Sequence, residues 1–160
     1  MKQADILIRQ YGAVIDMLDE TVQRCPDELW LDQLPVYPFW RLAYHAAFYT
    51  HLYSSDTAES FVPWEHLKTD LADPDHELGK DDEPCTKEDV AAYNRFIVEH
   101  VRSAIPRQDL DGPSGIPWWN QFNKMEMHIY NIRHTQHHVG QLVDRLRNET
   151  GMDVKWIGSV

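Results

Sequence analysis

Three histidines fall within five consecutive positions of the segment NIRHTQHHVGQL, residues 131–142. At about 100° per residue around a helix, His134 and His138 project from one face, whereas His137 is turned away by about 60°. Two imidazoles at positions i and i+4 can present nitrogen atoms to one metal ion. The sequence holds nine histidines in 160 residues, so the spacing is also compatible with solvated histidines on a helix surface.

His45 is the best candidate for a third ligand. It belongs to a stripe of mostly apolar and aromatic residues, namely Arg41, Leu42, His45, Phe48, Tyr49 and Leu52. A single histidine in such a stripe is more often a hydrogen-bonded core residue than a ligand, but a facing helix with an inward pair of histidines favours convergence. Three imidazoles suit Zn²⁺, Ni²⁺ or Fe²⁺. They leave a position open for water or substrate, as in catalytic rather than structural sites.

The other histidines do not extend this set. His51 points away from the stripe and is expected on the surface. No rival nucleophile is evident, because Ser114 lacks a G-x-S-x-G context and neither cysteine has a base nearby in the sequence. Three histidines have no companion at a useful spacing, namely His66, His76 and His100.

Five further side chains could support or line such a site, and each has a plain structural alternative. Tyr49 could hydrogen-bond a bound species or simply pack in the core. Gln141 could orient a ligand or water, or bond a neighbouring backbone. Arg41 could reach an anionic substrate or pair with one of the many carboxylates. Trp118 and Trp119 could wall the mouth of the site or close one end of the fold.

The elements that must position these residues are helices. Apolar residues recur at the helical period over residues 2–24, 39–55, 86–105 and 120–148. Thr86 and Asp89 stand in a near capping-box arrangement, and Gly151 is a plausible stop. The pattern predicts an all-α, up-down four-helix bundle in one domain, residues 1–160.

Two segments depart from this helical pattern. Residues 57–85 contain several prolines and no clear period, so we expect a long acidic crossover between the second and third helices. A short helical turn is expected within it around WEHLK, residues 64–68. Strands are almost absent from the pattern, although VKWIG near the end could be extended.

Composition excludes several classes of function. The formal net charge is -11 and the pI is about 5.1, which disfavours nucleic acids and anionic membrane surfaces. No apolar run approaches the roughly 20 residues of a membrane-spanning helix, and charges interrupt the first apolar run, unlike a signal peptide. Cys25 and Cys85 form no CxxC pattern and are expected to be free thiols. We predict a cytoplasmic protein.

The reverse faces of the second and fourth helices are also apolar. Opposite the histidine pair lie Met125, Ile129, Ile132, Val139 and Val143, and the reverse of the second helix carries Ala43, Ala47 and Ser54. A helix with two apolar faces is often buried on both sides. We therefore predict a homodimer through these two helices. The alternative is that the inner and outer faces are exchanged, which would leave the histidines exposed.

The segments WRLAYHAAFY and RHTQHHVGQL together resemble the DinB/YfiT-like family of four-helix-bundle metalloproteins. The resemblance follows the helix order of the whole chain, including the long crossover. It implies that His45, His134 and His138 are the metal ligands, with Gly140 and Gln141 completing the motif. Val139 stands where the family often has arginine, so any role of that arginine is absent or displaced here.

The resemblance implies a metal-dependent reaction on a small molecule. The activities it suggests are S-transfer or isomerisation with a low-molecular-weight thiol, and hydrolysis. Our preferred hypothesis is such an enzyme, with a divalent zinc, nickel or iron ion. The alternatives are a non-catalytic metal-binding or stress-response module, and a purely structural bundle with surface histidines.

Overall fold

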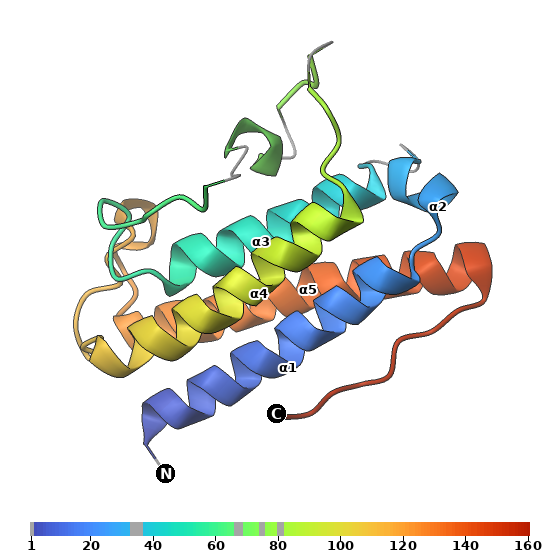
Figure 1. Ribbon diagram of the computed structural model, residues 1–160. Coiled ribbons are helices and arrows are strands. Elements are labelled where there is room, and N and C mark those ends of the chain that lie inside the picture. The colour runs from blue at the N-terminus through green and yellow to red at the C-terminus, as the bar shows by residue number, and fades with distance from the viewer. Residues whose placement is uncertain (1, 33–36, 66–68, 74–75, 80–81) are drawn as a thin grey trace.

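The described part of the chain is entirely helix, turn and coil. The computed structural model describes residues 2–32, 37–65, 69–73, 76–79 and 82–160 (Figure 1). Within these residues there are five α-helices and no strand. They are α1 (Gln3–Arg24), α2 (Asp27–Leu31), α3 (Phe39–Ser54), α4 (Lys87–Ala104) and α5 (Lys124–Thr150), with 3-10 turns η1 (Thr69–Ala72), η2 (Ile105–Arg107) and η3 (Pro117–Trp119). The predicted all-α class is confirmed.

Local sequence signals explain where the helices begin and end. The Thr86 side chain accepts from the Asp89 backbone N–H, and Asp89 completes the predicted capping box at the start of α4. Gly151 ends α5 in the left-handed conformation, with φ of 74°, as glycine at this position often does. The start of the last helix was predicted too early. Residues 117–119 form η3, and Asn123 caps α5 through the Glu126 N–H.

The four long helices lie side by side around a common hydrophobic core. α1 and α3 each pack against both α4 and α5, so the four helices close a ring (Figure 1). Large buried side chains from all four meet in this core, among them Tyr11, Trp40, Tyr44, Tyr93 and Met127. After Gly151 the chain runs back along α1 as coil, where the Gln10 side-chain amide donates to the Gly158 carbonyl at 3.3 Å. The VKWIG segment therefore forms no strand.

The predicted dimer surface lies largely inside the chain. Four of the predicted residues are completely buried, namely Ala43, Ala47, Ser54 and Val139. They are buried because the reverse face of α3 packs against α4 and that of α5 packs against α1. Ile129 alone of the predicted set is strongly exposed, at 51%. The apolar reverse faces are thus satisfied within one chain, and they give no support to a dimer. Dimerisation itself stays a prediction.

Two buried histidines belong to the core rather than to the surface. His51 was expected outside, but it is buried, with Nδ1 2.9 Å from the Tyr93 hydroxyl and its ring against His100. His128 is also buried, between the Tyr11 hydroxyl at 3.0 Å and the Gln108 side-chain oxygen at 2.7 Å. Burial lowers the pKa of both His51 and His128 to about 3, so both are neutral at pH 7.

The crossover between α3 and α4 is described in part. η1 packs against α3. Most of the expected turn around WEHLK falls on residues 66–68, outside the described residues. No helix in the described segments has both the length and the apolar character needed to cross a membrane.

We expect the free energy of unfolding to fall as the pH drops below about 6.5, the ordinary pKa of histidine. The folded-state pKa of His51 and of His128 is about 3. Between these values the unfolded chain binds protons that the folded chain does not, and each such histidine costs about 1.4 kcal/mol per pH unit. Urea unfolding at several pH values from about 7.5 to about 5 measures the slope.

Histidine variants isolate the contribution of a buried histidine to the pH dependence of stability. His51→Gln is expected to make the slope shallower by about 1.4 kcal/mol per pH unit, and His128→Gln serves if the first variant does not fold. His137→Gln, at an exposed position of α5, is the control that keeps the wild-type slope. A wild-type stability that does not change over this pH range would contradict the account.

Candidate metal centre

The contact between α3 and α5 sets the positions of the candidate ligands. Ala46, a small buried residue one turn before Thr50 on α3, permits a close approach of the two helices. The hydroxyl oxygens of Thr50 and Thr135 lie 2.7 Å apart, and the Asn131 side-chain amide donates to the Thr50 carbonyl at 3.0 Å. These buried polar contacts fix the register of the two helices. His134 immediately precedes Thr135, so the same register aligns it with His45.

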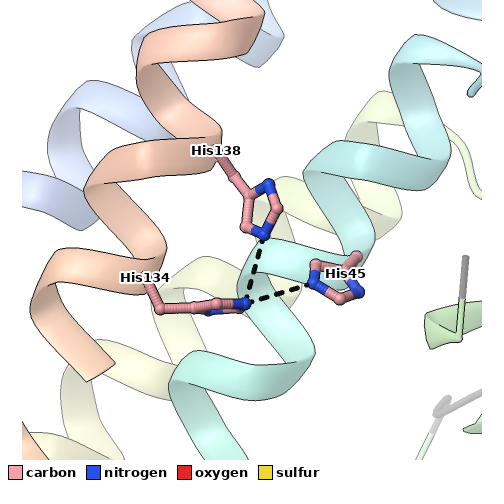
Figure 2. Close-up of side chains that lie close together, drawn as sticks. All are labelled: His45, His134 and His138. Carbon is pink, nitrogen blue, oxygen red and sulfur yellow. Dashed lines mark hydrogen bonds between the residues drawn. The ribbon is translucent and has the colours of Figure 1, made fainter. Parts of the chain in front are cut away.

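The three predicted ligands meet between α3 and α5. The Nε2 atom of His134 lies 3.3 Å from Nε2 of His45 and 3.1 Å from Nε2 of His138 (Figure 2). One ligand atom from each of the three histidines lies within 4.8 Å of the other two. Within the described residues this is the only group of three or more potential ligands brought so close. His45 is 8% exposed, and the other two are half-buried.

Hydrogen bonds select the tautomer of two of the imidazoles. His45 Nδ1 lies 2.8 Å from the Ala72 carbonyl oxygen, and His138 Nδ1 lies 2.8 Å from the Gln141 side-chain oxygen. Both partners are acceptors, so each Nδ1 carries the ring proton. Each Nε2 then keeps its lone pair and directs it toward His134. Metal-binding histidines are commonly oriented by acceptors in this way.

The spacing of these nitrogens fits a divalent metal ion. Metal–nitrogen distances of about 2.0 to 2.1 Å in a tetrahedral arrangement put neighbouring nitrogens about 3.3 to 3.4 Å apart. The two separations at His134, 3.3 and 3.1 Å, are close to that range. Without a metal ion, a single N–H at His134 Nε2 faces the lone pairs of both neighbouring imidazoles, and a bound cation in its place would accept lone pairs from all three rings.

Burial keeps these imidazoles unprotonated. Burial and the neighbouring His138 and His45 lower the pKa of His134 to about 3, and burial and His45 lower that of His138 to about 4. The pKa of His45 is also lowered, chiefly by burial. Since only a neutral imidazole can ligate a metal ion, the group is ready to bind one at neutral pH.

On its Nδ1 side, His134 is held by packing rather than by a hydrogen bond. Its Nδ1 atom is buried and has no hydrogen-bond partner among the described residues. Its ring lies against three tyrosines, with centroids 5.7 Å away for Tyr49, 6.2 Å for Tyr53 and 6.1 Å for Tyr130. An aromatic wall therefore surrounds the central imidazole of the site.

The other predicted site residues lie at different distances from the three histidines. Gln141 and Tyr49 lie at the centre, since Gln141 holds His138 and the Tyr49 ring is 4.6 Å from the His45 ring. Trp118 is 54% exposed and donates to the Tyr53 hydroxyl at 3.3 Å, next to the aromatic wall. Trp119 instead stacks on Phe122, with centroids 5.2 Å apart.

Arg41 contacts the backbone of the crossover. It is 5% exposed, and its guanidinium donates to the carbonyl oxygens of Asp73 and His76 in the crossover. This clamp holds the crossover against α3 next to Ala72. Arg41 thus supports the backbone that orients His45.

Sequence reasoning missed two contributions to the site. The Ala72 carbonyl leaves no trace in the sequence, because any residue at that position would supply the same oxygen. Tyr53 was visible in principle, since it follows Tyr49 by one helical turn and so shares its face.

Replacing Gln141 tests its hold on His138. Gln141→Leu removes the acceptor at Nδ1 and is expected to weaken zinc binding by roughly 10- to 100-fold. Gln141→Glu keeps an acceptor and is expected to bind zinc at least as tightly as the wild type. Gln136→Leu, also on α5, is the matched control. Competition titration against a chromophoric chelator measures all four proteins, and wild-type affinity in Gln141→Leu would contradict this role.

Comparisons with known proteins identify no relative of the chain. No protein-family model matches it. Neither the curated proteins nor the solved structures contain a significant match. The resemblance to the DinB/YfiT-like family therefore stays a prediction, and the case for a metal centre depends on the geometry of this chain.

Proposed function

We propose that the protein is a DinB/YfiT-type four-helix bundle that binds a divalent metal ion through His45, His134 and His138. The observation that carries this proposal is the convergence of the three Nε2 atoms, with separations of 3.3 and 3.1 Å at His134. The acceptors at Nδ1 of His45 and His138 add to it, because they direct lone pairs rather than protons into the centre. The ring of four packed helices and the crossover after α3 agree with the proposed bundle.

The proposed role is that of a metal-dependent enzyme acting on a small molecule. A zinc, nickel or iron ion with three protein ligands can activate water for hydrolysis or a low-molecular-weight thiol for transfer. The chain itself supplies neutral imidazoles, a partly buried setting and an aromatic wall. Tyr49, whose ring contacts His45, is a candidate to orient a substrate by hydrogen bonding.

The rival proposal is a module that binds metal without catalysis. The half-buried positions of His134 and His138 favour the enzyme, since they leave the centre accessible from solvent. A closed structural site with four protein ligands would exclude substrate. Both proposals require a bound metal ion, and they differ only in whether the protein catalyses a reaction.

Metal binding is the first test. We expect the metal-free protein to bind one zinc ion per chain, and His45→Ala, His134→Ala and His138→Ala each to weaken binding at least 100-fold by removing a ligand. His137→Ala is the matched control, because it removes a neighbouring exposed imidazole that does not point into the centre. Calorimetric titration measures the stoichiometry and affinity. Equal affinity in His137→Ala and His138→Ala would contradict the assignment.

Turnover separates the enzyme from the module. We expect zinc-, nickel- or iron-loaded protein to accelerate either thiol addition to an electrophile or hydrolysis of an activated ester or amide. The rate is expected to fall at least 100-fold in His138→Ala and to persist in His137→Ala. Absence of turnover with every metal and thiol tested, in protein that binds the metal stoichiometrically, would favour the non-catalytic module.

A further inference from the structure

A pocket of about 310 Å³ adjoins the metal centre between α3 and η1. Tyr49 lines this pocket and also contacts the His45 ring at 4.6 Å. Ala72 lines it too, and its carbonyl accepts from His45. The pocket and the metal centre therefore share a wall. Its volume is that of a small-molecule site at the lower end of the usual range.

Aromatic rings form one side of the pocket. Phe48, Tyr49 and Trp118 line it, and Phe48 and Tyr49 meet edge to face with centroids 5.1 Å apart. Trp118 is 54% exposed although it is a large apolar residue. The faces of aromatic rings carry partial negative charge and attract cations.

Two carboxylates also line the pocket. Asp70 and Asp73 line the pocket, and both lie at exposed positions of the crossover. The two carboxylates thus line the same pocket as the aromatic rings. A ligand in the pocket would face both negative charge and aromatic surface.

Two basic side chains that the structure describes near the pocket, Arg41 and His76, are already engaged. Arg41 does not line it, and its guanidinium donates to the backbone carbonyls of Asp73 and His76. Among the lining residues that the structure describes, His76 is the single basic one, and its Nε2 lies 3.5 Å from the Asp82 carboxylate. The formal net charge of the chain, -11, also disfavours an anionic ligand. Among the described lining residues, an anionic ligand would thus find no unengaged basic side chain.

We propose that this pocket binds an organic cation, namely an ammonium group on a small apolar body. The aromatic faces would hold the cation by cation–π attraction, and the two carboxylates would pair with its charge. That the cation is the substrate, with its uncharged part toward the histidines, rests on the proposed function. The binding itself does not require the metal.

The test compares three benzyl probes that differ in charge. Benzyltrimethylammonium, benzyl alcohol and phenylacetate are titrated calorimetrically into the full chain, with and without zinc. We expect the cation to bind more tightly than the other two. Asp70→Asn and Trp118→Leu are each expected to weaken its binding about three- to tenfold, and Trp118→Phe is expected to retain most of it. Asp111→Asn, at an exposed carboxylate that does not line the pocket, is the matched control.

The outcomes separate this proposal from that of the metal centre. Phenylacetate or benzyl alcohol binding as tightly as the cation would overturn the pocket assignment. Unchanged cation binding in both Asp70→Asn and Trp118→Leu would also overturn it. If zinc binds but the cation does not, the pocket proposal fails alone. If the cation binds but zinc does not, the pocket proposal is supported and the proposed function fails.

Discussion

The packing of α3 against α5 is the constraint on which the rest of the structure depends. A small residue, Ala46, lets the two helices approach, and the buried contacts from Thr50 to Thr135 and Asn131 fix their register. A shift of α5 by a single residue would rotate His134 and His138 by about 100° away from His45. The other helices serve this contact, because α1 and α4 cover the reverse faces of α5 and α3 and thereby turn the histidine faces toward each other.

The convergence of three unprotonated imidazoles is what would allow the centre to bind a metal ion. His45 and His138 each hold Nδ1 against an oxygen acceptor and bring Nε2 to the same nitrogen of His134. Neutral imidazoles grouped in this way could hold a metal ion, because three nitrogens would reach it at once. His51 and His128 provide the contrast within the same chain. Their rings meet tyrosine hydroxyls, which satisfies them inside the core.

The sequence predicted the helices and the grouping of His45, His134 and His138, because both depend on local periodicity. The HxxxH pair and His45 lie on helix faces that a 3.6-residue period assigns directly. Which neighbour covers a given face was not predictable in this way. His51 and Val139 were placed on outer faces, but α4 and α1 of the same chain bury them. The role of Arg41 and the Ala72 carbonyl escaped prediction because both depend on how the irregular crossover returns to α3.

The central claim is that three imidazoles from two helices hold one metal ion. Anomalous diffraction from crystals grown with zinc, measured on both sides of the zinc absorption edge, tests it most directly. The account predicts one peak per chain, about 2.1 Å from the Nε2 atoms of His45, His134 and His138. A peak that contacts only one or two of these histidines, or well-ordered imidazoles with no peak between them, would contradict it.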